Sequence, residues 1–206
     1  MHRVINYILS FPYIYKLFIN CLKNKKTDLY GDYINVPEKS KVMDIGCGPA
    51  QVLDRIPDSV EYHGFDLSET YIRAATKKYN HRNAFFKCAP VESETLEPSL
   101  VGSFDMVLAL GVLHHINDEA ASRLLQLAKT AMKDKGVLIT HDPCFLRQQQ
   151  KLMAKTLARM DRGKYVRYPD QYESLVASFF SDQVETFVRN DALRLPYNII
   201  VMRMVK

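Results

Sequence analysis

The chain has 206 residues, of which 47% are hydrophobic and 25% are charged. This length suits one globular domain, and this composition excludes a disordered tail and a fibrous repeat. The four cysteines, Cys21, Cys47, Cys88 and Cys144, form neither a CxxC pair nor a spacing that would bind zinc. We therefore expect free thiols in a reducing cytoplasmic protein and no metal site.

The net charge of +5 is concentrated at the start of the chain. Residues 1–26 carry five basic residues and no acidic one, whereas the remaining basic and acidic residues balance. Because residues 27–206 carry no net charge, the sequence does not indicate a basic surface that binds nucleic acids. We therefore expect a small-molecule partner rather than a nucleic acid.

Residues 4–22 place apolar side chains at helical spacing, but polar residues and Pro12 interrupt the run. The segment is too polar to span a membrane and lacks the apolar stretch of a signal peptide. We expect residues 1–26 to form an amphipathic helical cap. It would either pack on the domain, over its active site, or touch an anionic membrane peripherally.

Short apolar segments alternate with amphipathic ones along the rest of the chain. We expect strands at 41–45, 60–65, 84–88, 104–110, 137–140, 183–189 and 199–204, and helices at 51–56, 69–79, 118–132, 145–160 and 169–180. This alternation predicts an α/β, Rossmann-like doubly wound sheet of seven strands, mostly parallel, with helices on both faces. The short connection 190–196 predicts a final hairpin and therefore an antiparallel last strand.

The strongest local signal is Asp44-Ile45-Gly46-Cys47-Gly48-Pro49, between a strand and a helix. Glycines there let the backbone turn sharply and approach a ligand closely. The dinucleotide fingerprint GxGxxG is incomplete, because its third glycine position holds Gln51. Asp66, which ends the second strand, can accept hydrogen bonds from both hydroxyls of a ribose. Asp44 can orient the glycine loop or meet a ligand's amino group.

Four blocks in this order resemble the motifs of class I S-adenosylmethionine-dependent methyltransferases. They are Val42–Ala50, Gly64–Ser68, Phe104–Val107 with Gly111–Ile116, and Lys133–Ile139. Together they cover roughly residues 40–142. The resemblance implies a cofactor-binding core, with S-adenosylmethionine as methyl donor and S-adenosylhomocysteine as product.

The resemblance also implies positions for the parts of the donor. The methionine part of the donor would lie against Asp44, Gly46, Cys47 and Gly48, and its sulfonium end against Leu110 and Gly111. The ribose would lie against Asp66. The adenine would lie against Leu67, Cys88 and Ala89. Many members carry an acid where this chain has Ala89. Adenine recognition is therefore expected to use backbone groups, apolar contacts or Glu92.

Candidate bases follow the fourth and fifth strands. His114 and His115 lie just beyond residues 104–110, and His141 lies near the end of the fifth strand with Asp142. A neutral imidazole has the basicity for proton transfer near pH 7. Each histidine could instead be structural. Of the first pair, we favour His115.

The acceptor is expected to meet the basic and aromatic segment 161–168, where Arg162, Tyr165 and Arg167 are the candidate contacts. Arginines can hold carboxylates, phosphates or sugar hydroxyls, although the segment could also be a solvated loop. Residues after 142 resemble small bacterial methyltransferases of polysaccharide or natural-product type. The Asn/Asp-Pro-Pro-aromatic sequence of enzymes that methylate DNA adenine or protein glutamine is absent after residue 110.

The predicted function is methyl transfer from S-adenosylmethionine to a hydroxyl of a sugar, lipid-linked or natural-product compound. We expect one domain over residues 1–206: a cap at 1–26, the cofactor-binding core at 40–142, and acceptor-side helices with the final hairpin at 143–206. The alternatives are a catalytically degenerate module that binds S-adenosylmethionine or docks on a membrane and, more remotely, an NAD-dependent oxidoreductase. No feature of the sequence indicates an oligomeric state.

Overall fold

The computed structural model describes residues 29–90, 96–147, 163–180, 183–190 and 198–206. The expected N-terminal cap and Glu92 lie outside these residues. So does the expected helix from residue 148 onward, and its first residues, 145–147, are not helical.

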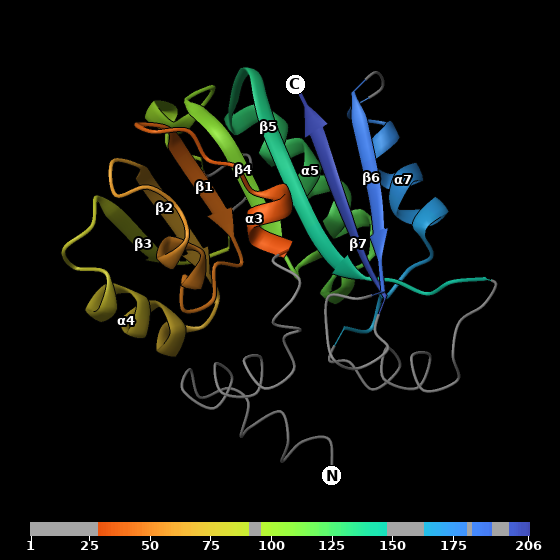
Figure 1. Ribbon diagram of the computed structural model, residues 1–206, viewed down its shortest axis with the longest axis horizontal. Coiled ribbons are helices and arrows are strands. Elements are labelled where there is room, and N and C mark those ends of the chain that lie inside the picture. Colours follow the sequence, from red (N-terminus) through yellow and green to blue (C-terminus); the bar gives the residue numbers. More distant parts are fainter. Residues whose placement is uncertain (1–28, 91–95, 148–162, 181–182, 191–197) are drawn as a thin grey trace, which may run out of the picture.

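A seven-stranded sheet forms the centre of the molecule (Figure 1), and its strand order is β3-β2-β1-β4-β5-β7-β6. The strands are β1 (Lys41–Ile45), β2 (Glu61–Asp66), β3 (Ala84–Cys88), β4 (Phe104–Leu110), β5 (Met132–Pro143), β6 (Val184–Arg189) and β7 (Ile199–Val205). The first five strands pair in parallel, whereas β7 runs antiparallel to both β5 and β6. The predicted doubly wound sheet with an antiparallel last strand is confirmed.

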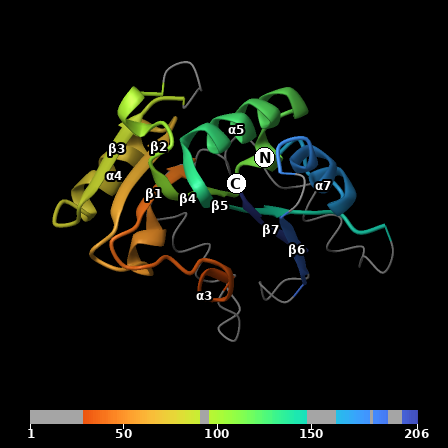
Figure 2. The ribbon, with the colours of Figure 1, turned by 90° about the horizontal axis from the view of Figure 1, so that it is seen from above.

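Helices cover both faces of this sheet. The α-helices are α3 (Leu29–Tyr33), α4 (Glu69–Lys78), α5 (Asp118–Ala131) and α7 (Pro169–Ala177), and the 3-10 turns are η1 (Gln51–Asp54), η3 (Pro98–Leu100) and η4 (Leu113–His115). Figure 2 shows α5 and α7 on one side and α3 on the other. The apolar side chains of α5 and α7 fill one core, and those of α4 and η1 fill the core on the α3 side.

Local chemistry sets where the main elements begin. The side chain of Ser68 accepts a hydrogen bond from Tyr71 N at 3.4 Å and starts α4. Asn117 Oδ1 accepts from Ala120 N at 2.9 Å and starts α5 directly after η4. Strand β4 is almost entirely buried, as a central parallel strand should be. It ends at Leu110, at the edge where open α/β sheets bind their ligands.

The structure corrects one expected helix. The segment after the glycine loop is a single 3-10 turn, η1, rather than a helix over residues 51–56. Arg82 donates to the carbonyl oxygens of Leu53, Ile56 and Pro57, which fixes a short return to β2. Helix α5 ends at Ala131, one residue before the expected end, and β5 starts at once.

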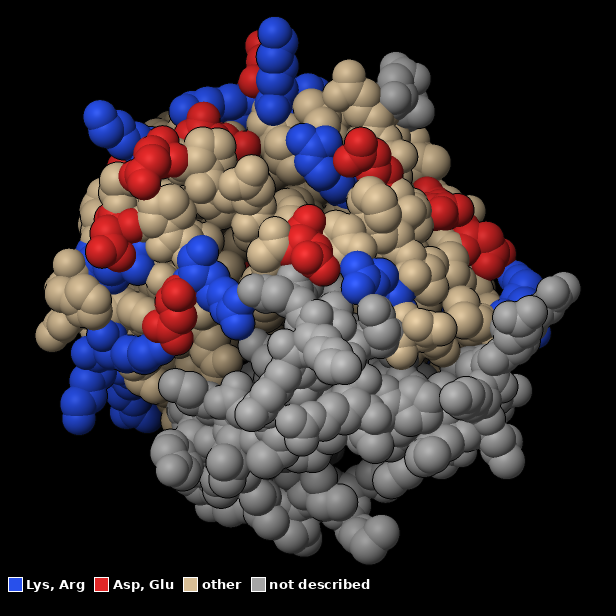
Figure 3. All heavy atoms as spheres, in the orientation of Figure 1, with Lys and Arg blue, Asp and Glu red and all other residues tan. Residues whose placement is uncertain are grey.

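Lys, Arg, Asp and Glu side chains are interspersed over the described part of the face in Figure 3. Among the described residues, no helix is long and apolar enough to cross a membrane. The expected membrane contact concerned residues 1–26, which lie outside the described residues.

Candidate active site

The glycine loop joins β1 to η1 and is tied to the end of β2. The backbone N–H groups of Gly46 and Cys47 donate to Phe65 O at 2.8 and 3.0 Å. Gly46 and Gly48 have φ angles of 73° and 53°, which favour glycine. A Cβ at Gly46 would lie 2.6 Å from Val112 Cγ2, whereas one at Gly48 would meet no atom within 4 Å. The loop is therefore packed below Gly46 and open beside Gly48, where a ligand can approach the backbone.

Asp66 lies next to this open side. Its carboxylate accepts hydrogen bonds from Gly48 N at 2.8 Å and from Ser68 N at 2.7 Å. A carboxylate has about four acceptor positions, so it can also accept from the hydroxyls of a ribose. The side chain of the following residue, Leu67, is 75% exposed and can pack on a flat ring. These positions fit an adenosine.

The end of β3 lies beside Leu67. Cys88 is exposed, and its thiol donates to Leu67 O at 3.7 Å, while Ala89 is half-buried. Cys88 therefore lies beside Leu67, and Ala89 follows it in the chain. Ala89 offers no carboxylate to the adenine amino group.

Asp44 is buried beneath the glycine loop. Its Oδ2 accepts a hydrogen bond from the Tyr62 hydroxyl at 2.6 Å, and its Oδ1 is buried without a hydrogen-bond partner. A buried carboxylate oxygen without a partner destabilises the ligand-free protein. This oxygen can accept from a ligand that brings a donor group, such as the ammonium of the methionine part.

The sulfonium end was expected at the carboxyl end of β4. Gly111 N donates to His141 O at 2.6 Å, so the ends of β4 and β5 are joined there. A Cβ at Gly111 would lie 3.7 Å from His114 Cε1. The structure therefore brings Gly111 and the imidazole of His114 side by side.

His114 and Asp142 form a buried pair across β4 and β5. Asp142 Oδ1 lies 2.7 Å from His114 Nδ1 and also accepts from the backbone N–H of His114 at 3.1 Å. An ionised Asp142 makes Nδ1 the donor of this pair, so Nε2 is the nitrogen that can take up a proton. The aspartate that completes the pair lies 28 residues further along the chain.

The other two candidate histidines have different surroundings. His115 is exposed, and its ring centroid lies 4.0 Å from that of His114. His141 is half-buried and lines a small hollow with Tyr30, Tyr33 and other apolar residues. The geometry favours His114 over His115, because an aspartate orients the ring of His114.

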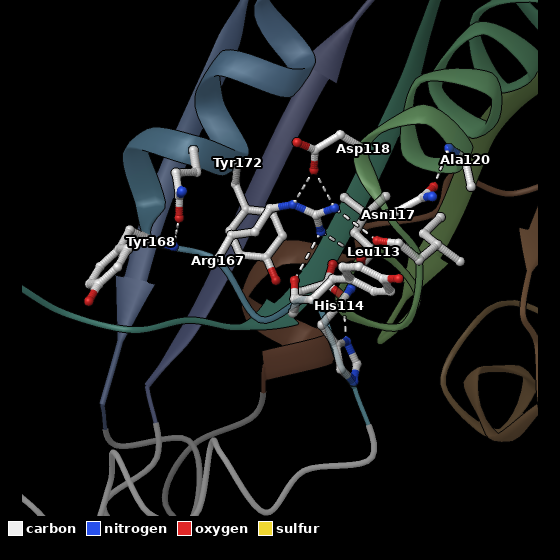
Figure 4. A network of polar contacts seen from close by, with 12 residues as sticks. Leu113, His114, Asn117, Asp118, Ala120, Arg167, Tyr168 and Tyr172 are labelled. Atoms are coloured by element: carbon white, nitrogen blue, oxygen red, sulfur yellow. Dashed lines mark hydrogen bonds and ion pairs between the residues drawn. The ribbon is translucent and has the colours of Figure 1, made fainter.

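Arg167 is buried inside a network that holds the His114 turn (Figure 4). Its guanidinium donates to the carbonyl oxygens of Leu113, Tyr165 and Ile116 at 2.7 to 3.0 Å and to the Asp118 carboxylate at 2.7 and 2.9 Å. These contacts use all five N–H groups of an arginine. The expected acceptor contact for Arg167 therefore gains no support, and the arginine instead fixes the backbone around His114.

Of the two remaining candidates for contact with the acceptor, the structure describes Tyr165 but not Arg162. Tyr165 is 41% exposed, and its backbone N–H donates to His114 O at 2.9 Å, so its segment lies against the turn. Gly163 packs directly on His114, because a Cβ there would lie 2.1 Å from His114 Cδ2. Arg162 lies outside the described residues.

Comparisons with known proteins agree with this geometry. Residues 43–138 match the model of a methyltransferase domain family. No curated protein matches the chain.

Similar solved structures include phosphoethanolamine N-methyltransferase 2 from Haemonchus contortus, crystallised with phosphomonomethylethanolamine and S-adenosylhomocysteine. It has a TM-score of 0.65 and 15% identity over 86% of this chain, and this chain spans about half (51%) of its length. A SAM-dependent methyltransferase from Methanosarcina mazei has a TM-score of 0.62 and 14% identity over 86% of this chain and 97% of its own.

A third is geranyl diphosphate C-methyltransferase from Streptomyces coelicolor, with a TM-score of 0.64 and 9% identity over 85% of this chain and 73% of its own. At these identities the solved structures establish the fold, and the domain match covers residues 43–138, slightly less than half of the chain. Residues 43–138 are therefore similar to a methyltransferase domain, in a fold that the chain shares with S-adenosylmethionine-dependent methyltransferases.

Proposed function

We propose that this protein transfers a methyl group from S-adenosylmethionine to a hydroxyl of a small molecule. The observation that carries the proposal is the buried His114–Asp142 pair beside Gly111, at the edge of the donor site. A hydroxyl is a poor nucleophile until it loses its proton, whereas an amine that is already neutral needs no base. An imidazole held by a carboxylate at this place therefore supports oxygen as the acceptor atom.

The donor supplies an electrophilic methyl group on a sulfonium and leaves as S-adenosylhomocysteine. In the proposed site Asp66 accepts from the ribose hydroxyls, and Leu67, Cys88 and Ala89 contact the adenine. Asp44 and the loop Gly46–Gly48 hold the methionine part. Leu110 and Gly111 border the sulfonium.

His114 accepts the proton of the acceptor hydroxyl at Nε2 as the oxygen bonds to the methyl carbon and the carbon–sulfur bond breaks. Asp142 keeps Nδ1 protonated and stabilises the imidazolium that forms. Such a base contributes about 10²–10⁴-fold to a rate. Alignment of donor and acceptor contributes more, roughly 7–11 kcal/mol. Arg167 supports that alignment, because it fixes the turn that carries His114.

The acceptor is proposed to be a sugar, a lipid-linked compound or a natural product. Two of the similar structures have small-molecule substrates in their names, phosphoethanolamine and geranyl diphosphate. Tyr165 is half-exposed beside His114 and is the described residue best placed to contact the acceptor; Arg162 remains a candidate. We further propose a cytoplasmic protein without a nucleic-acid partner, in which residues 1–26 either cover the site or touch a membrane.

A catalytically degenerate donor-binding module is the second candidate. Two observations favour it: Ala89 lacks the adenine-binding acid, and η1 is one short turn where a longer helix was expected. Both weaken donor recognition. A protein of this kind would bind S-adenosylhomocysteine without methylating any acceptor.

Two measurements test the proposal in sequence. Calorimetric titration should give micromolar binding of S-adenosylhomocysteine and no binding of NAD. The opposite result would reject methyl transfer and favour an NAD-dependent oxidoreductase. Incubation with S-adenosylmethionine labelled on its methyl group and a panel of phenols, sugars, isoprenoid alcohols and primary amines should then label at least one hydroxyl. Labelled amines with unlabelled hydroxyls would overturn the choice of oxygen.

A further inference from the structure

Asp44 and Tyr62 form a buried pair on adjacent strands, under the proposed methionine site. Asp44 is 3% exposed and Tyr62 is 0% exposed. The Tyr62 hydroxyl donates to Asp44 Oδ2 at 2.6 Å, and Asp44 Oδ1 is buried without a hydrogen-bond partner. One carboxylate oxygen of Asp44, Oδ2, therefore has a hydrogen-bond partner in the protein, whereas Oδ1 is available to accept a hydrogen bond from a ligand.

The charge around Asp44 indicates which ligand group fits. The groups of the described residues that act on its carboxyl are the Tyr62 hydroxyl and the Asp66 carboxylate, and neither is a cation. Cys47 is also close enough to interact with Asp44, and burial raises the pKa of its thiol far above the usual range, so it stays neutral. A cationic group that donates a hydrogen bond to Oδ1 would also offset the repulsion between Asp44 and Asp66. A water or a neutral amide could donate to Oδ1 but would not offset that repulsion.

We propose that Tyr62 is a positioning residue for the methyl donor: by donating to Oδ2 of Asp44, its hydroxyl leaves Oδ1 to accept the donor's ammonium group. This inference rests on the proposed function, because it takes S-adenosylmethionine as the ligand. It adds to the site a residue on β2 that lies two positions before the second motif and does not touch the donor.

The arrangement makes donor binding depend on pH. Burial raises the pKa of Asp44 from 3.8 to about 7, repulsion from Asp66 adds to this rise, and the hydrogen bond from Tyr62 opposes it. In the empty site Asp44 is therefore protonated below about pH 7, and a protonated carboxyl does not attract an ammonium. Donor affinity should fall as the pH falls through 7, by up to tenfold per unit, because one proton must leave before the cation binds.

Removal of the Tyr62 hydroxyl should extend this dependence to higher pH. Tyr62→Phe keeps the buried ring and loses the hydrogen bond that favours the ionised carboxylate. The midpoint of the pH dependence should therefore rise, and affinity for S-adenosylhomocysteine at pH 7 should fall about tenfold, the effect of one hydrogen bond to a charged group. Asp44→Asn should bind weakly, with an affinity that hardly changes with pH.

The test is calorimetric titration of the full chain with S-adenosylhomocysteine from pH 5.5 to 7.5, a range in which a free amino group stays mainly protonated. The matched ligand is 5′-methylthioadenosine, which has the adenosine and the sulfur but neither the ammonium nor the carboxylate. The matched variant is Tyr79→Phe, because Tyr79 is also buried and its hydroxyl also donates to a carboxylate, that of Asp54 at 3.0 Å.

We expect Tyr62→Phe to shift the pH dependence for S-adenosylhomocysteine only, and Tyr79→Phe to leave both ligands unchanged. An affinity of the wild type that is constant over this range would overturn the inference, as would equal effects of the two variants or equal effects on the two ligands. In each case the proposed function would stand. Failure of S-adenosylhomocysteine to bind at any pH would instead reject the proposed function itself.

Discussion

The donor side and the acceptor side of this molecule are built in different ways. On the donor side, neighbouring residues in two short motifs make the site, and many of their contacts use the backbone, as when Gly48 N and Ser68 N donate to Asp66. On the acceptor side, single side chains join segments far apart in the sequence: His114 meets Asp142, and Arg167 reaches the carbonyl of Leu113 across 54 residues. A motif can therefore indicate a donor site, whereas only the folded chain shows which histidine an aspartate orients.

This comparison predicts that acceptor-side changes alter rate or stability without altering donor affinity. The largest effect is expected for His114→Gln, which should lower the turnover number by about 10²–10⁴-fold because the base is lost. Its affinity for S-adenosylhomocysteine should change less than threefold. Turnover is measured with the acceptor found in the panel.

His115→Gln is the matched control, since its ring lies beside that of His114 but is exposed. It should keep most of the activity. A larger loss in His115→Gln than in His114→Gln would reverse the assignment of the base.

A smaller effect is expected for Arg167→Ala. The carbonyl oxygens of Leu113 and Ile116 would lose their buried donor, which should cost roughly 3 kcal/mol of folding free energy and lower the melting temperature by several degrees. Arg147→Ala is the control: Arg147 binds the exposed Asp170 and should leave the melting temperature unchanged. Equal melting temperatures for both variants would mean that the Arg167 network does not stabilise the turn.

On the donor side, Asp66→Ala should weaken S-adenosylhomocysteine about 100-fold, because two hydrogen bonds to a charged acceptor are lost. Glu69→Ala removes an exposed carboxylate three residues away, paired with Arg73, and should bind normally. Calorimetry compares the two. Undiminished affinity of Asp66→Ala would remove the ribose assignment.

The smallest effect concerns the helix that starts beside the His114 turn. Asn117→Ala removes the cap of α5 and should cost about 1 kcal/mol in thermal or urea unfolding, with donor affinity unchanged. Asn83→Ala, at an exposed position outside any helix, serves as the control. If donor affinity fell in Asn117→Ala, the donor side and the acceptor side would be coupled through η4, which would contradict their independence.

Sequence patterns predicted the helices and strands whose apolar residues follow a regular local pattern. The apolar run 104–110 coincides with β4, because a strand buried on both faces needs such a run, and Asn117 and the period of 118–131 define α5. The segment after the glycine loop was expected as a helix, because nothing in 51–56 reveals that Arg82 holds three of the neighbouring carbonyls. Long-range contacts of this kind leave no local pattern.

The same limit applies to the site. The donor positions follow from motifs, whereas the choice between His114 and His115 depends on which ring Asp142 reaches. Arg167 was expected at the acceptor because arginines in loops often bind anions, yet all its N–H groups are used inside the protein. The partnership of Asp44 with Tyr62 was missed too, since Tyr62 reads as an ordinary aromatic residue of a buried strand.

Two cysteines of the proposed donor site differ in exposure, which allows selective chemical labelling. Cys47 is buried in the glycine loop with its thiol held in the protonated form, whereas Cys88 is exposed at the edge proposed to bind the adenine. A thiolate is the reactive form, so an alkylating dye should modify Cys88 and spare Cys47. Once Cys21, outside the described residues, is replaced by serine, such a dye would sit where the nucleoside enters. Its fluorescence could then report nucleoside occupancy in real time, without any knowledge of the acceptor.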